Sequence, residues 1–185
     1  MKYLHYAFLL VFSIAFTLLT LVLSPVLPLF ANNNGWLPWA LSWFSTSDNS
    51  LDGDIGYQTE HAPFLGPQTG FKRYLNRVVW ILRNPAYGFE TSGFMGANIS
   101  PSDQVLTTGN PFIKNRNQAV AGSYYCEIGE YWNYKLVTKP FYDGQTCFML
   151  ELGWKLQPYA QSVEALKTQP VAQFVFSPRI TAFLP

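Results

Sequence analysis

A stretch without any charged side chain, residues 3–47, constrains this chain more than any other feature. Its first half, residues 3–23, is almost continuously apolar. As an α-helix this half would be roughly 32 Å long, and the hydrocarbon core of a bilayer is about 30 Å thick. The sequence therefore predicts a helix that can cross a membrane.

Three interpretations of this helix compete: a permanent single-pass anchor, a cleaved signal peptide and a buried core helix. Its apolar centre is longer than the roughly 7–15 residues of a signal peptide. The best cleavage candidate, residues 29–31, begins with leucine where a small residue belongs. A core helix of this length rarely lacks charge. Because Pro25 and Pro28 each remove a backbone donor, the helix should end at Ser24, and a permanent anchor is favoured.

Composition bounds the rest of the chain. The formal net charge is +1 and 12% of residues are charged, which argues against nucleic acid as a partner. Aromatic residues make up 17%, a level typical of strands, interfaces and membrane boundaries. We expect three segments: a transmembrane anchor over residues 1–24, a Pro- and Trp-rich juxtamembrane segment over 25–47, and one small domain over 48–185.

Three tryptophans follow the proline break: Trp36, Trp39 and Trp43. At spacings of three and four they would share one face of a helix. Beside a membrane span this pattern predicts a short helix in the headgroup region. The alternative is that the same face packs on the protein's own domain.

A stripe of small hydroxylated residues lies within the span. Ser13, Thr17, Thr20 and Ser24 recur at spacings of four, three and four, so they fall on one helix face. Such residues let membrane helices approach closely, which predicts a helix–helix contact and a homo-oligomer. Alternatively, the hydroxyls bond to carbonyls of their own helix and face lipid.

The domain is predicted to be α+β. Residues 71–82 have the apolar spacing of one amphipathic helix, and its polar positions carry basic residues and an asparagine but no acid. From residue 122 the pattern alternates with period two, and its clearest strand covers residues 147–156. This strand places large apolar side chains on one face, which we expect to pack against the helix. The result is a small antiparallel β-meander packed with one helix.

Two cysteines, Cys126 and Cys147, lie on predicted neighbouring strands. Outside the cytoplasm they could form a disulfide, and otherwise they would be two buried thiols. The sequence leaves both alternatives open.

An acidic loop contains Asp48, Asp52 and Asp54, which are candidates for a Ca²⁺ site because hard cations take oxygen ligands from flexible loops. The loop lacks the alternating ligands and closing glutamate of a known calcium loop. Asx-turns that cap local structure explain the same residues.

The sequence shows no catalytic constellation, and we expect neither catalytic residues nor a cofactor. The two histidines are His5, in the apolar run, and His61, in a Pro- and Gly-rich loop. The sequence contains no nucleophile elbow, phosphate-binding glycine loop or histidine pair at metal spacing. An enzyme is therefore not favoured.

A succession of motifs resembles small uncharacterised membrane-associated proteins of tailed bacteriophages and prophages. The motifs are Ser24-Pro-Val-Leu-Pro-Leu-Phe-Ala31, Trp36-Leu-Pro-Trp39, Ser47-Asp-Asn-Ser-Leu-Asp-Gly-Asp54, Arg83-Asn-Pro-Ala-Tyr-Gly-Phe89, Leu152-Gly-Trp-Lys-Leu156 and Phe176-Ser-Pro178. The resemblance implies a phage or bacterial source and membrane association, and it assigns no functional residue.

The leading hypothesis is a phage-encoded single-pass membrane protein that acts by binding a host or phage envelope protein, as in superinfection exclusion. It would reside in the bacterial inner membrane. Lys2 is the only basic side chain near the span, and it lies on the N-terminal side. Because basic flanks stay in the cytoplasm, the domain that follows the span would face the periplasm. The alternatives are a lysis-related or virion-structural component and, with less support, a membrane-tethered hydrolase that uses the three aspartates and His61.

Overall fold

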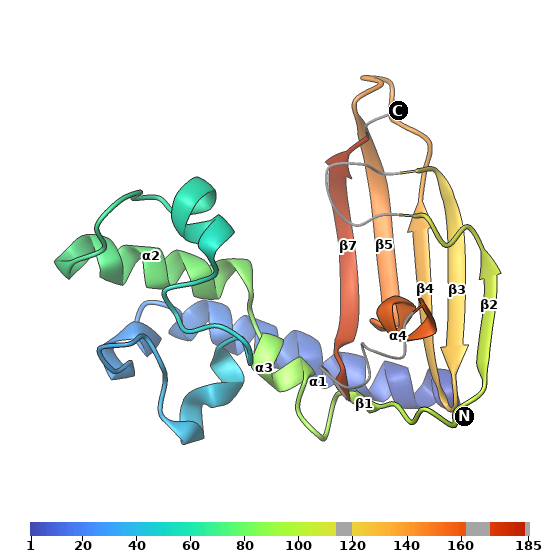
Figure 1. Cartoon of the computed structure of the whole chain (residues 1–185), viewed down its shortest axis with the longest axis horizontal. Helices are drawn as coiled ribbons and strands as arrows, with labels where there is room; N and C mark the ends of the chain where they lie inside the picture. Colours follow the sequence, from blue (N-terminus) through green and yellow to red (C-terminus); the bar gives the residue numbers. More distant parts are fainter. Residues whose placement is uncertain (114–119, 162–170, 184–185) are drawn as a thin grey trace. The chain divides into compact units, whose positions relative to one another are not determined.

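The computed structural model describes residues 1–113, 120–161 and 171–183. The chain forms two compact units: Met1–Tyr6 with Gly93–Pro185, and Ala7–Ser92. One long helix, α1 (Lys2–Leu23), contributes its first turns to the first unit and the remainder to the second (Figure 1). The α+β class predicted from the sequence is confirmed.

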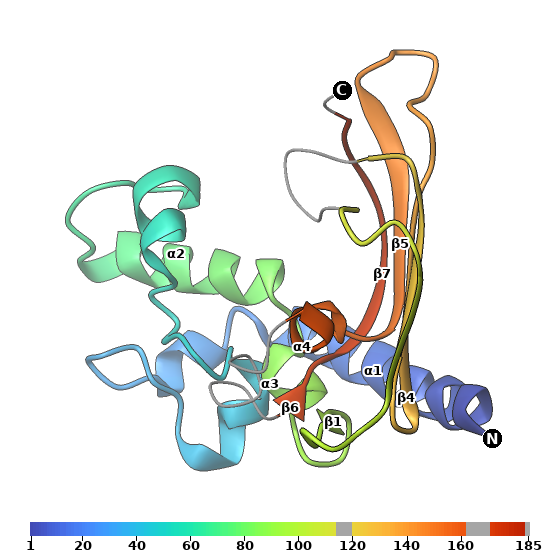
Figure 2. The same cartoon turned by 45° about the vertical axis from the view of Figure 1, so that its right-hand side comes forward.

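The first unit is built on an antiparallel meander. Its five-stranded sheet has the order β2-β3-β4-β5-β7, and β1 pairs separately with β6. Figure 2 shows the curvature of this sheet and the short helix α4 (Gln157–Gln161) beside it. The strands are β1 Ala97–Asn98, β2 Val105–Gly109, β3 Gly122–Ile128, β4 Tyr131–Val137, β5 Thr146–Trp154, β6 Val171–Ala172 and β7 Phe174–Ala182.

The two faces of the sheet are covered unequally. On β5 the side chains of Cys147, Met149 and Glu151 are buried, whereas those of Leu150 and Leu152 are only partly buried. We call the face that carries Cys147, Met149 and Glu151 the covered face, and the face that carries Leu150 and Leu152 the open face. The alternation matches the sequence pattern, but the more deeply buried face is the one that carries fewer large apolar residues. The reason is that α4 and its neighbours lie against the covered face, where Gln157 bonds Lys135 of β4.

A backbone constraint shapes β5. Gly153 has a φ of +97°, and a Cβ at this position would lie 2.0 Å from the carbonyl oxygen of Trp132 on β4. Only glycine fits both the conformation and the close approach.

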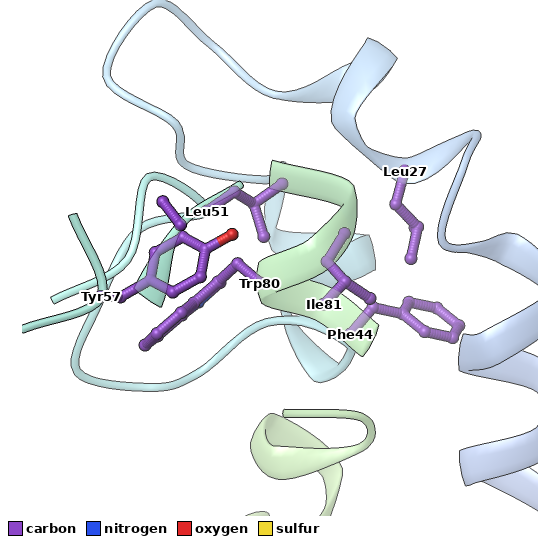
Figure 3. Packing of buried hydrophobic residues seen from close by; sticks show 7 residues of the cluster. Leu27, Phe44, Leu51, Tyr57, Trp80 and Ile81 are labelled. Carbon is purple, nitrogen blue, oxygen red and sulfur yellow. The ribbon is translucent and has the colours of Figure 1, made fainter. Parts of the chain in front are cut away.

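The second unit is helical. It contains the 3₁₀ segments η1 (Leu27–Phe30) and η2 (Trp39–Phe44), the π-helical turn η3 (Tyr57–His61), the helix α2 (Gly70–Arg83) and the short helix α3 (Tyr87–Glu90). Figure 3 shows six labelled side chains of its core. They are Leu27, Phe44, Leu51, Tyr57, Trp80 and Ile81.

Helix α2 matches the amphipathic helix predicted over residues 71–82. Its buried positions include Trp80 and Ile81, which belong to the core of the second unit. The sequence pattern therefore predicted the helix but not its buried face, because Asn76 and Arg77 of the predicted polar side are buried whereas Phe71 and Leu82 of the predicted apolar side are exposed. It did not reveal that this face packs among residues 7–92, whereas we had expected it to cover the sheet.

Candidate functional site

Helix α1 presents two different faces in the second unit. The inward residues recur at spacings of three and four, and they are Leu9, Ser13, Phe16, Thr20 and Ser24. Only 22% of the helix's most apolar 18-residue window is buried in the protein. Most of the helix surface is therefore exposed, unlike that of an ordinary core helix.

The inward face is fixed by aromatic stacking. The ring of Phe16 stacks on Phe44, with centroids 4.6 Å apart, and on Phe89, with centroids 4.2 Å apart. Beside this stack, Ser13 Oγ donates a hydrogen bond to Glu90 Oε1 at 3.1 Å. These contacts make α1 part of the second unit's core.

The hydroxylated stripe proposed for helix–helix contact lies on this inward face. Ser13, Thr20 and Ser24 are buried, and Thr17 is half-buried. Thr20 Oγ1 and Ser24 Oγ also bond backbone carbonyls of their own helix, at 2.8 and 2.9 Å. The expected use of the stripe in self-association is thus corrected, because the protein's own residues occupy this face.

The outward face of α1 is apolar along its whole length. Phe8 is 56% exposed, Val11 67%, Leu18 58% and Val22 74%. The helix is long and apolar enough to cross a membrane. Contiguous apolar surfaces of this extent mark protein or membrane interaction sites on soluble proteins. We call this surface the outer face of α1.

The three tryptophans near the helix are exposed to different degrees. Trp39 is 91% exposed, Trp36 44% and Trp43 51%. They do not share one helix face, since η2 begins only at Trp39. Trp43 also contacts the ring of Phe16, with centroids 6.3 Å apart. Trp43 therefore packs on the protein itself, as the second alternative expects, and the location of the tryptophans in the headgroup region stays a prediction.

The first turns of α1 are fixed to the sheet within the first unit. Lys2 Nζ forms an ion pair with the carboxylate of Glu127, and its hydrogen bond is the largest cause of the lowered pKa of Glu127. Tyr6 Oη donates a hydrogen bond to the carbonyl oxygen of Val175 at 3.0 Å. The Tyr6 ring also packs edge-on against Trp132, with centroids 5.0 Å apart. These contacts bind the N-terminal end of the helix to β3, β4 and β7.

A row of polar groups is buried on the covered face. Lys135 Nζ lies 3.6 Å from Glu151 Oε1, and both side chains are less than 5% exposed. Lys135 Nζ also donates to Gln157 Oε1 at 2.9 Å. Asn133 Nδ2 donates to the carbonyl oxygen of Leu152 at 3.2 Å. In the described part of the chain Asn133 Oδ1 is buried without a hydrogen-bond partner. This row neutralises its own charges and serves the fold.

The two cysteines are free thiols, so the alternative of a disulfide between Cys126 and Cys147 is corrected. They lie on β3 and β5, which are separated by β4. Two strand spacings amount to about 10 Å, whereas a disulfide needs Cα atoms within about 7 Å. Burial raises the pKa of Cys126 to about 11, which leaves the thiol protonated and unreactive.

The acidic loop does not form a metal site. Asp52 Oδ1 accepts hydrogen bonds from Arg73 Nε at 2.9 Å and Arg77 Nε at 2.7 Å. Asp54 Oδ1 accepts from the backbone N–H of Tyr57 at 2.7 Å. Among the described residues no group of three or more acidic, histidine or cysteine side chains could hold a metal ion. The candidate Ca²⁺ site of Asp48, Asp52 and Asp54 is therefore corrected, because arginines bind the carboxylate of Asp52 and the start of η3 uses that of Asp54.

The pKa of Asp52 follows from this pairing. Burial alone would raise it, but the hydrogen bonds and charges of Arg73 and Arg77 outweigh burial and lower the pKa to about 2. The proposed hydrolase loses its support here, since Asp52 is engaged. His61 Nε2 lies 3.9 Å from Glu60 Oε2 with both side chains exposed.

The whole chain was compared with known proteins. A family of unknown function, DUF7338, matches residues 1–181. The chain belongs to this family. No curated protein and no solved structure matches it. Membership of DUF7338 assigns no activity, so any function must be argued from the geometry of the chain itself.

Sequence reasoning missed two features of this DUF7338 chain. The ion pair between Lys2 and Glu127 joins residues 125 positions apart, and no local pattern signals it. The buried pair of Lys135 and Glu151 follows from strand register, since the two residues lie opposite each other on β4 and β5. Correct pairing of the two strands could have found the second feature.

Proposed function

We propose that this protein is held on a membrane by α1 and acts by binding at a bacterial envelope. The observation that carries the proposal is the outer face of α1, where large apolar side chains are exposed along the helix. Trp36 and Trp39 are also exposed, and tryptophan is the residue type that favours the headgroup region of a bilayer. The first partner is therefore a lipid bilayer.

The resemblance to phage and prophage proteins supports the bacterial inner membrane as this bilayer and superinfection exclusion as the activity. Binding rather than catalysis is supported by exposed apolar residues on the sheet as well, such as Phe176 and Ile180 on β7. The periplasmic orientation was predicted from the positive charge of Lys2. Because Lys2 forms an ion pair with Glu127, this charge says little about the orientation of the helix. The lysis alternative loses the oligomerisation stripe that motivated it.

Cell fractionation tests membrane binding. The full-length protein should sediment with membranes, resist extraction by high salt and be released by detergent. Recovery of full-length folded protein in the soluble fraction would contradict the proposal.

A matched pair of variants locates the surface. Val11→Asp combined with Leu18→Asp places two charges on the outer face and should move the protein to the soluble fraction. Gln58→Asp combined with Thr59→Asp adds the same charge at exposed positions of η3 and should leave it on the membrane.

The envelope activity has its own test. Expression of the protein in a bacterial host should reduce plating of an infecting phage, and the Val11→Asp, Leu18→Asp variant should not. Equal plating with and without a membrane-bound protein would contradict superinfection exclusion while leaving membrane binding intact.

A further inference from the structure

The first turns and the middle of α1 are each bound to chain that follows the helix. Within the first unit, Lys2 pairs with Glu127 and Tyr6 bonds Val175. Within the second unit, the inward face packs through Phe16 on Phe44 and Phe89. These two sets of contacts hold independently of how the units are arranged.

A single-pass topology is hard to reconcile with these contacts. In that topology residues 24–185 lie on one side of the bilayer, and Lys2 lies on the other. The hydrocarbon core between them is about 30 Å thick, so Lys2 could not reach Glu127. The carboxylate of Glu90, which bonds Ser13 near the middle of the helix, would also lie at the depth of the acyl chains, where ionised groups are strongly disfavoured.

We propose that α1 lies in the plane of the membrane, in one leaflet, with the outer face of α1 in lipid. An in-plane helix needs a polar side that faces water. Here the folded protein replaces that polar side, because Ser13, Thr20 and Ser24 are buried against the unit. The protein is thus monotopic, and its specific partner is the surface layer of one leaflet.

This inference rests on the proposed membrane binding and adds the topology. It explains why the outer face is apolar along the full length of the helix. In a spanning helix that contacts lipid all round, the inward face would have no reason to carry Ser13, which bonds Glu90, and Phe16, which stacks on Phe89.

Depth measurements along α1 test the inference. The variants Leu4→Cys, Val11→Cys, Leu18→Cys and Val22→Cys each place a reactive thiol at an exposed position of the outer face. Each full-length protein is labelled with a small fluorophore and bound to vesicles of phosphatidylethanolamine and phosphatidylglycerol. Lipids brominated at different acyl positions then report the depth of each label. The native Cys126 and Cys147 are buried, and unsubstituted protein carried through the labelling provides the control.

An in-plane helix predicts the same shallow depth at all four positions. A depth profile with residue 11 near the bilayer centre and residues 4 and 22 near opposite surfaces would overturn the inference and leave membrane binding intact. Failure of the unsubstituted protein to bind vesicles would overturn the proposed function instead.

Discussion

At the scale of single residues, Asp52 shows how the acidic loop is used. Its carboxylate receives both Arg73 and Arg77 of α2, and the side chain of Arg77 is only 9% exposed. An arginine this deeply buried needs a partner, since an unpaired buried charge is strongly destabilising. Asp52 therefore fixes the loop to α2 rather than binding a cation.

Asp52→Asn should destabilise the second unit by about 2–4 kcal/mol at pH 7, because it leaves Arg77 unpaired. The folded-state pKa of Asp52 lies near 2, below its ordinary value of 3.8, so its contribution is present above pH 4 and disappears as the pH falls toward 2. Denaturant unfolding at several pH values measures both effects. The variant should lose less stability than the wild type between pH 5 and 2, and the exposed-site control Asp48→Asn should behave like the wild type.

The two thiols give a second prediction at this scale. Cys126 and Cys147 are buried, and burial raises the pKa of both. A maleimide should therefore label neither in the folded protein and both after denaturation, with or without reductant. Labelling that requires reductant would reveal a disulfide and contradict the separation of β3 and β5.

At the scale of elements, the two faces of α1 should respond differently to the same kind of substitution. Phe16→Ala removes a ring stacked on Phe44 and Phe89 and should cost about 3 kcal/mol. Leu18→Ala on the outer face should change the stability of the detergent-solubilised protein by less than about 1 kcal/mol. Thermal unfolding in detergent compares the two, and equal losses would contradict the two-faced helix.

The sheet offers a charge test. Glu151→Gln leaves the buried Lys135 without its counter-charge and should destabilise the first unit by about 3 kcal/mol. The double replacement Lys135→Met, Glu151→Leu removes both charges and should recover most of that loss. A double variant as unstable as the single one would show that the pair does more than neutralise itself.

Local patterns predicted the elements well and their packing poorly. The spacing of apolar residues gave α2, and period-two alternation gave β3, β4 and β5. The same patterns could not tell which face of β5 is the more deeply buried, because Gln157 and its neighbours cover a face that carries Glu151. The stripe from Ser13 to Ser24 was recognised as a contact face, but only tertiary structure shows that its partner is the chain itself.

At the scale of the whole molecule, α1 belongs to two units and is long and apolar enough to cross a membrane. Its inward side packs in a core, its first turns pair with the sheet, and its outer face is exposed. Fully burying a large apolar side chain contributes about 1.5–3 kcal/mol, so several half-exposed ones on the outer face would together contribute on the order of 5 kcal/mol to membrane binding. An in-plane helix gains this energy without breaking the contacts of Lys2 or Phe16.

The contact between Lys2 and Glu127 in the membrane-bound protein tests this topology most directly. Lys2→Cys combined with Glu127→Cys places two thiols at paired positions, and Lys2→Cys combined with the fully exposed Tyr142→Cys is the control. A short bifunctional maleimide applied to intact membranes should join the two thiols of the first pair within one chain and leave the control pair unjoined. A pair that crosslinks in detergent but never in membranes would show that α1 crosses the bilayer and would contradict the monotopic arrangement.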